Sequence, residues 1–290
     1  MSNRLRPDLL TEFPIERYFI SRELGVGAFG MVHLHELKEE YESNEDNPSV
    51  VAVKAFQSQH YFEVEVEKLK ILSHNELLQH PNFVKIYGCC LMGKLFGIVM
   101  EKYDMTLQSL VDNYTLMSKG GHLDVALTRN ILYQLANAME FLHKKNLLHR
   151  DVKPDNILIR DDETGIQVAL SDLGASRVIM ATEVSKLTPA GTDIWMAPEV
   201  NQCRSKYGHP SDVYGFGLVA LFIKTGCKPP RKAQSGNIKG SGYYIIYVNI
   251  RHTLCFKFNK SSTAAFPMGL LIETQLIRTQ IIGVNRLRVN

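Results

Sequence analysis

The spacing of hydrophobic residues predicts strands in the first part of the chain. Residues 21–37 alternate apolar and polar positions around a run of glycines, and residues 49–56 form a short β-branched run. Both patterns are typical of strands. The acidic segment between them is expected to be a solvated hairpin loop. Residues 83–90 and 94–103 also indicate strands.

Residues 61–73 fit two patterns. Phe62, Val64 and Val66 alternate like the residues of a strand, whereas Phe62, Val66 and Leu69 follow the spacing of a helix. Periodicity alone therefore leaves a strand and a helix open for this segment.

Helical spacing dominates the later part of the chain. Residues 123–145 place five apolar side chains on one stripe of a helix: Leu127, Ile131, Leu135, Met139 and Leu142. This stripe predicts a long amphipathic helix, and residues 211–226, which are apolar on all sides, predict a helix buried inside a large domain. A small β-rich part followed by a larger helical part predicts an α+β fold with two lobes and a cleft between them.

Composition excludes several classes of protein. The 290 residues are 45% hydrophobic and 22% charged, with a net charge of +3, which excludes a disordered chain and gives no general attraction to nucleic acid or anionic membranes. Five cysteines without a CxxC pair argue against a disulfide framework and a zinc module. No apolar run reaches the roughly 18 residues of a membrane span. We therefore expect a cytoplasmic protein in a reducing compartment.

The net charge is uneven along the chain. Residues 231–290 hold nine Lys and Arg residues and one acid, Glu273, whereas the preceding part holds more acids than bases. This tail mixes turn-rich and β-branched runs without a clean helical or strand period. Because charge is the only feature that favours nucleic-acid binding, we expect a divergent basic tail and no nucleic-acid partner.

A glycine run and a lysine form the first candidate site. Residues 25–30 (GVGAFG) have the GxGxxG pattern, but a strand rather than a helix is expected to follow, which excludes a dinucleotide-binding motif. In a hairpin, glycines let backbone N–H groups approach phosphate oxygens, although the run taken alone fits a flexible turn equally well. Lys54 closes the next predicted strand and is placed to reach phosphates below this loop. It then needs a carboxylate partner, for which Glu63, Glu65 and Glu67 are candidates.

A dense polar cluster at residues 149–156 (HRDVKPDN) is the second candidate site. Its proline prevents a helix and its flanks are apolar, so we predict a polar loop between buried anchors. Asp151 can accept a hydroxyl proton while Lys153 neutralises charge on the group under attack. Asn156 and Asp172 offer the oxygen ligands that magnesium takes when it is bound to substrate phosphates.

Eight segments, in this order, resemble the eukaryotic protein kinase family. They are GVGAFGMV, VAVK, HPNFVKIYG, IVMEKY, HRDVKPDN, SDLG, GTDIWMAPE and SDVYGFG. The resemblance implies a two-lobed kinase fold with an N-terminal extension at 1–17, an N-lobe at 18–103, a partial C-lobe at 104–228 and a divergent tail at 229–290. It also implies ATP and Mg²⁺ as cofactors and a protein as substrate.

The resemblance assigns catalytic roles to the polar cluster. Asp151 is expected to be the base that orients the acceptor hydroxyl, and Lys153 the cation that faces the transferred phosphoryl group. Thr192 is expected to hydrogen-bond near both. Asn156 and Asp172 are expected to hold magnesium.

The resemblance also assigns nucleotide contacts. Lys54 is expected to contact the α- and β-phosphates and to pair with Glu65, because the family places this acid four residues before an apolar position, here Leu69. Glu67, four residues before Ile71, is the alternative. The remaining contacts come from the glycine loop, the gatekeeper, the hinge and the adenine pocket: Leu24, Gly25, Val26, Gly27, Ala28, Phe29, Gly30, Val32, Ala52, Met100, Glu101, Tyr103 and Leu158.

The substrate class follows from one position. In the family, kinases that act on serine and threonine carry a lysine two residues after the base, as Lys153 does here. GTDIWMAPE and SDVYGFG are similar to the tyrosine-kinase-like group of these Ser/Thr kinases. Arg150 commonly binds a phosphate on the activation loop in the family, which makes Thr182, Ser185 and Thr188 candidate phosphosites.

Two features depart from the family pattern. Leu173 replaces the usual phenylalanine after the magnesium-binding acid, a swap between apolar residues that typically costs under about 1.5 kcal/mol. Residues 229–290 do not resemble the last helices of the family. They also contain no arginine in the sequence context of the one that pairs, in the family, with the acid at Glu199. A catalytically weak or inactive scaffold of the same fold, which binds nucleotide or partners, is therefore the alternative to an active kinase. The protein-kinase-like GTDIWMAPE segment disfavours a small-molecule kinase. The sequence does not indicate an oligomeric state.

Overall fold

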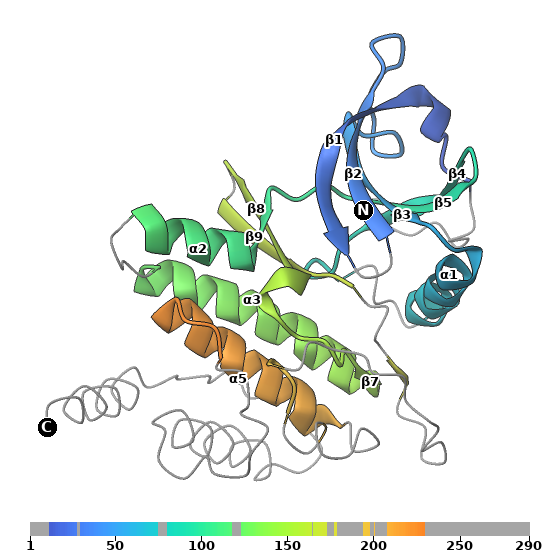
Figure 1. Cartoon of the computed structure of the whole chain (residues 1–290). Helices are drawn as coiled ribbons and strands as arrows, with labels where there is room; N and C mark the ends of the chain where they lie inside the picture. The colour runs from blue at the N-terminus through green and yellow to red at the C-terminus, as the bar shows by residue number, and fades with distance from the viewer. Residues whose placement is uncertain are drawn as a thin grey trace, which may run out of the picture. The chain divides into compact units, whose positions relative to one another are not determined.

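An antiparallel sheet forms the first part of the chain, as the alternating pattern predicts. The structure is a computed structural model that describes residues 12–27, 30–74, 80–117, 123–163, 165–172, 177–178, 194–197, 200 and 208–229. The strands are β1 (Tyr18–Gly27), β2 (Gly30–Leu37), β3 (Val50–Phe56), β4 (Ile86–Met92) and β5 (Leu95–Met100). They lie in the order β1-β2-β3-β5-β4 (Figure 1).

The ambiguous segment is a helix, α1 (Gln59–His74), which lies beside the sheet (Figure 1). Phe62 stacks on Phe96 of β5, with ring centroids 5.0 Å apart. Val66 is buried and Phe62 is partly buried, whereas Val64 is exposed. The helical spacing therefore describes this segment correctly, because strand alternation would place all three of these α1 side chains on one face.

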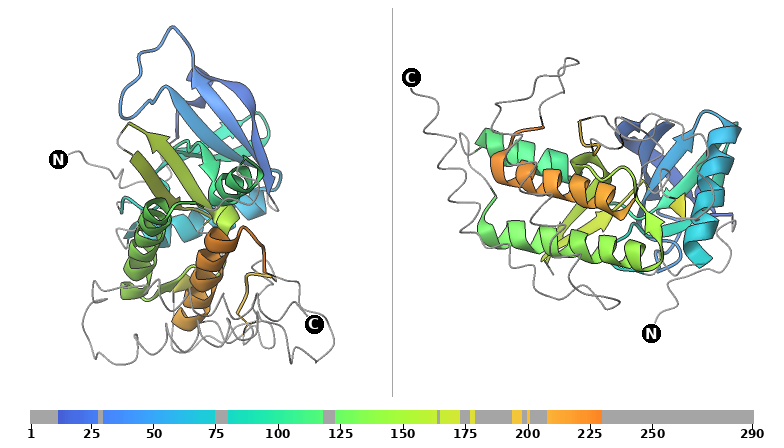
Figure 2. Two further views of the ribbon diagram at one scale, coloured as in Figure 1. Left: turned by 90° about the vertical axis from the view of Figure 1, so that its left-hand side faces the viewer. Right: turned by 90° about the horizontal axis from the view of Figure 1, so that it is seen from below.

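Helices dominate the second part of the chain. They are α2 (Leu107–Met117), α3 (Val125–Lys144) and α5 (His209–Thr225), and α3 packs against α5 (Figure 2). Short strands complete it: β6 (Met105–Thr106), β7 (Leu147–Leu148), β8 (Ile157–Asp162), β9 (Gly165–Leu170) and β10 (Arg177–Val178). Strands β6, β8 and β9 form one sheet, and β7 pairs with β10. The predicted α+β architecture is confirmed.

Helix α3 follows its predicted apolar stripe. Asp124 caps its first turn, because its Oδ1 accepts a hydrogen bond of 2.9 Å from the N–H of Leu127. Ile131, Leu135 and Leu142 are fully buried. The same stripe packs on β9 and so supports the strand that leads into the polar site. In the part of the chain that the structure describes, no helix combines the length and the apolar character that a bilayer span needs.

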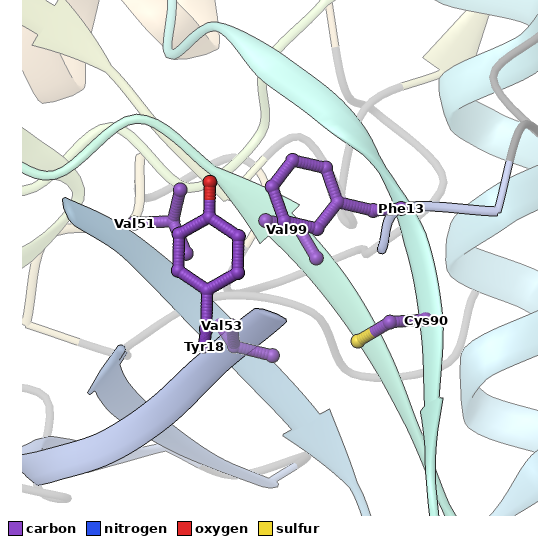
Figure 3. Packing of buried hydrophobic residues seen from close by; sticks show 6 residues of the cluster. All are labelled: Phe13, Tyr18, Val51, Val53, Cys90 and Val99. Carbon is purple, nitrogen blue, oxygen red and sulfur yellow. The ribbon is translucent and has the colours of Figure 1, made fainter. Parts of the chain in front are cut away.

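Residues just before β1 complete the core of the first sheet. The N–H of Phe13 donates a hydrogen bond of 2.7 Å to the carbonyl of Cys89 on β4, and the short 3₁₀ helix Ile15–Arg17 leads into β1. Figure 3 shows the resulting cluster of Phe13, Tyr18, Val51, Val53, Cys90 and Val99. Only 1% of the Phe13 surface is exposed. Residues 12–17, which the sequence placed in an extension, therefore contribute to the N-lobe core.

We predict that Phe13→Ala lowers the free energy of unfolding by about 3–5 kcal/mol, because it leaves a cavity in this core. Urea denaturation of the purified chain measures the loss. Phe19→Ala is the matched control, because Phe19 lies on β1 with 47% of its surface exposed, and it should cost roughly 0.5 kcal/mol or less. Equal costs for the two substitutions would contradict this view of residues 12–17.

Candidate active site

Lys54 joins α1 to the segment that follows β9. Its Nζ lies 3.3 Å from Oε1 of Glu65 and 3.1 Å from Oδ1 of Asp172. Glu67, the alternative partner, contacts Lys70 instead. Burial lowers the pKa of Lys54, but the two carboxylates outweigh burial and leave the pKa raised. The ammonium therefore stays charged between two acids that lie far apart in the sequence.

The polar loop holds Asp151 from two sides. Its Oδ2 accepts hydrogen bonds of 2.6 Å from Nζ of Lys153 and of 3.0 Å from Nδ2 of Asn156. The same Nδ2 donates to the backbone carbonyl of Asp151 at 2.8 Å. Since these bonds occupy the amide nitrogen of Asn156, its carboxamide oxygen is the atom left to bind a cation.

Asp172 is connected to this loop through its neighbour Ser171. The backbone N–H and the hydroxyl of Ser171 both donate to the carbonyl of Asn156, at 2.8 and 3.0 Å. The Nε2 atom of His149 lies 3.0 Å from the carbonyl of Ser171. Hydrogen bonds and ion pairs therefore link Lys54 and Asp172 to the polar loop within one network.

The charge at Asp172 is favoured by its surroundings. Burial raises the pKa of this carboxyl group, but Lys54, followed by His149 and Lys153, outweighs burial and lowers the pKa. Its backbone has φ 56°, a left-handed conformation that costs a non-glycine residue about 1–3 kcal/mol. Together with the carboxamide oxygen of Asn156, the carboxylate gives a set of oxygen donors that suits Mg²⁺.

The described part of the glycine run pairs β1 with β2: Gly25, Val26, Gly27 and Gly30. Ala28 and Phe29 lie outside the described residues. A Cβ atom at Gly30 would approach the carbonyl oxygen of Ala55 to 1.9 Å, so the close contact with β3 requires glycine there. A Cβ atom at Gly25 would meet no atom within 4 Å. The packing of the described residues therefore explains the last glycine of the run and not the first.

The residues predicted to surround adenine come from both sheets. Ala52 pairs with Met100 across β3 and β5, and Val32 on β2 pairs with Lys54. Ala52 and Lys54 share one face of β3, because alternate residues of a strand point the same way. Leu158 lies on β8. Ala52 is buried, whereas four of the predicted residues keep accessible surface: Leu24, Val32, Met100 and Leu158.

The predicted hinge follows β5. The N–H of Glu101 donates to the carbonyl of Lys85 at 2.9 Å, so its own carbonyl is the backbone group left for a ligand. Within the described residues, the N–H of Tyr103 has no hydrogen-bond partner. The hinge therefore offers one acceptor and one donor, the two types of group that an adenine edge can bind.

Comparison with known proteins identifies a family for this chain. The sequence matches the family described as "Protein kinase domain" over residues 18–272. The chain belongs to the protein kinase domain family. The family resemblance expected from the eight segments is thereby confirmed, and the match continues past residue 228 into the segment that the sequence indicated as divergent.

Individual relatives match part of their own length. The Aurora kinase of Saccharomyces cerevisiae is 29% identical over 219 residues, which cover 74% of this chain and 54% of that protein. The serine/threonine-protein kinase CTR1 of Arabidopsis thaliana is 33% identical over 212 residues, 71% of this chain and 24% of that protein. Myosin-IIIb of Mus musculus is 32% identical over 227 residues, 74% of this chain and 16% of that protein. The kinase domain therefore spans about half the length of these relatives or less.

Some residues of the kinase domain that the sequence singled out lie outside the described part of the chain. They are Leu173, Thr182, Ser185, Thr188, Thr192 and Glu199. Trp195, from the same segment as Thr192, is described. It is buried, and its ring lies edge-on to Phe222 of α5 with centroids 5.8 Å apart.

Asp212 on α5 holds the polar loop of the kinase domain from behind, and our sequence reasoning did not assign it a role. Its two oxygens accept hydrogen bonds of 2.8 Å from the backbone N–H groups of His149 and Arg150. His143 lies 3.0 Å away, and Arg150 is held at φ 72°. An acid inside a helix that is apolar on all sides must have buried partners, so the pattern of α5 contained the signal for this residue.

We predict that Asp212→Ala destabilises the kinase domain by about 2–5 kcal/mol, because one buried and one partly buried N–H group lose their acceptor. Burial raises the pKa of Asp212, but His143, with help from His149 and Arg150, lowers it overall. The stability that this carboxylate supplies is therefore present above its unfolded pKa of about 3.9 and is lost as the pH falls through the lower folded value. Chemical denaturation between pH 3 and 7 measures both effects.

The isosteric variant Asp212→Asn separates charge from shape. Its stability should fall less than that of the wild type as the pH drops from about 5 to 3. Asp112→Asn on the exposed side of α2 is the control and should follow the wild-type curve. A wild-type slope in Asp212→Asn would show that this carboxylate does not contribute to acid sensitivity.

Proposed function

We propose that this kinase domain transfers the γ-phosphoryl group of Mg-ATP to a serine or threonine hydroxyl of a protein. The observation that carries the proposal is the position of Lys54, which contacts Glu65 and Asp172 at the same time. This arrangement presents a fixed positive charge next to a carboxylate that can bind a metal. Transfer of a phosphoryl group requires positioning and charge stabilisation of this kind.

Asp151 serves as the base in this proposal. Its bonds to Lys153 and Asn156 hold its carboxylate in one orientation. The carboxylate accepts the proton of the acceptor hydroxyl, while the ammonium of Lys153 offsets negative charge on the phosphoryl group. The lysine at this position also favours serine and threonine over tyrosine, and CTR1, one of the relatives, is named a serine/threonine-protein kinase.

The nucleotide is held by the remaining residues of the site. Lys54 binds phosphate oxygens, and the adenine base lies between the hinge and the apolar side chains of the two sheets. Asn156 and Asp172 would hold Mg²⁺, which neutralises charge on the phosphate oxygens when it is bound. Asp172 is suited to this role because its lowered pKa keeps it ionised at neutral pH.

We predict that Asp151→Asn lowers the rate of phosphoryl transfer by about two to four powers of ten, because the carboxamide cannot accept the hydroxyl proton. The affinity for Mg-ATP should change little. A radiometric assay with a protein substrate measures the rate, and isothermal titration measures the affinity. Asp112→Asn makes the same chemical change on the exposed side of α2 and should leave the rate unaltered.

The same measurements separate an enzyme from a scaffold. Wild-type activity no higher than that of Asp151→Asn, together with normal nucleotide binding, would favour a scaffold of the kinase fold. Analysis of the phosphorylated amino acids tests the substrate class in an active preparation. Phosphoserine or phosphothreonine is expected, and phosphotyrosine as the main product would contradict the proposed specificity.

A further inference from the structure

Arg160 connects β8 to the hinge. It follows Leu158 by two residues on this strand, and its Nη1 lies 2.7 Å from Oε1 of Glu101. The guanidinium carbon lies over the ring of Tyr103, 5.5 Å from the centroid. The hydroxyl of Tyr103 donates to the other oxygen of Glu101 at 3.0 Å. The three side chains therefore form a closed set in which each contacts the other two.

The burial and the charges of Arg160, Glu101 and Tyr103 favour these contacts. Side-chain exposure is 28% for Arg160 and 23% for Glu101, so their ion pair is only partly screened by water. Burial, and then Glu101, raises the pKa of Tyr103. Its hydroxyl group therefore stays protonated and continues to donate. A guanidinium group can bind a carboxylate and cover an aromatic ring at the same time, which an ammonium group does less well.

Backbone bonds hold the two ends of the same segment. The N–H of Glu101 donates to Lys85, and the N–H of Asp104 donates to the carbonyl of Ile159 at 2.9 Å. The carboxylate of Asp104 accepts from the N–H of Asp161 at 3.0 Å. Between these two ends, no backbone hydrogen bond joins Lys102 or Tyr103 to another described residue. Arg160 contacts the side chains of Glu101 and Tyr103, which lie on either side of Lys102.

We propose that Arg160 is a positioning residue for nucleotide binding, which fixes the hinge backbone through Glu101 and Tyr103 in the conformation that accepts an adenine base. The inference rests on the proposed function, because it assigns the carbonyl of Glu101 and the N–H of Tyr103 to the base. When the hinge is already fixed before the ligand binds, no binding free energy is spent on ordering the hinge. Without Arg160, only a fraction of the molecules has the binding conformation, and the apparent affinity falls by that fraction.

The test compares nucleotide binding by the whole chain and its variants. Arg160→Met keeps the approximate length of the side chain but removes its charge and the N–H donors of the guanidinium group. We expect this variant to raise the Kd for Mg-ATP about tenfold. Arg160→Lys keeps the charge and should lie between Met and the wild type. In kinetics, the KM for ATP should rise while kcat stays within about twofold, as expected when an interaction made equally in the ground and transition states is lost. Isothermal titration and initial rates give these values.

Three comparisons separate positioning from general stability. Binding of Mg-tripolyphosphate, which has no base, should be unchanged in Arg160→Met. Asp162→Asn removes another ion partner of Arg160, at 3.3 Å, without touching the hinge, and should bind Mg-ATP like the wild type. Glu101→Gln should weaken binding, and the double variant with Arg160→Met should be no weaker than the worse single variant, because both changes remove the same pair.

The outcomes distinguish this inference from the proposed function. Wild-type affinity for Mg-ATP in Arg160→Met, or an equal loss of affinity for tripolyphosphate, would overturn the role of Arg160. If Arg160→Met does not fold, Arg160→Lys and Glu101→Gln carry the same test, and normal binding in both would overturn it. A wild-type chain that binds Mg-ATP and transfers no phosphoryl group would contradict the proposed function alone. A wild-type chain that binds no nucleotide would overturn both.

Discussion

One partly buried cation connects the two lobes of this kinase domain. Lys54 on β3 contacts a carboxylate of α1 and a carboxylate that follows β9, and 17% of its side chain is exposed. A charge with so little access to water is tolerated only when it is paired. If either carboxylate moved away, the ammonium group would keep only one opposite charge nearby. The displaced carboxylate would also lose its cationic partner at a position with little access to water. Helix α1 and the end of β9 are therefore constrained by the same group that the proposed function assigns to the phosphates.

The polar loop at residues 149–156 is held from two directions by residues distant in sequence. Ser171 bonds to Asn156 on one side, and Asp212 receives the N–H groups of His149 and Arg150 on the other. Such bonds maintain the left-handed backbone at Arg150, which a free loop of ordinary residues would seldom adopt. The position of Asp151 is therefore set by these bonds to other segments, and the loop does not need to be rigid by itself. The buried helix α5 thus helps to position Asp151, the base of the proposed function, through backbone groups of the loop.

Most of the architecture and the polar site could be predicted from the sequence, because strand alternation, the stripe of α3 and a dense polar loop are local signals. The partner of Lys54 needed the family spacing before Leu69, since three glutamates alternate on the same segment. The burial of Phe13 could not be predicted, because a single aromatic residue before the first strand is not part of a repeating pattern of hydrophobic positions. Arg160 was missed for a similar reason: a charged residue on a short strand is most often solvated, and its contact with Glu101 spans 59 positions.

Two of the residues that sequence reasoning missed, Asp212 and Arg160, bear on the choice between enzyme and scaffold. Asp212 accepts hydrogen bonds from two backbone N–H groups of the polar loop, and Arg160 contacts the side chains of two hinge residues. A chain can keep every motif residue and still lose the geometry if such supports are absent, because a misplacement of about 1 Å is enough to cost a hundredfold in rate. Both supports are present among the described residues of this chain. The contacts of Asp212 favour catalysis over scaffolding more than the motifs alone do, since a scaffold needs no fixed position for a base. The contacts of Arg160 suit an enzyme and a nucleotide-binding scaffold equally.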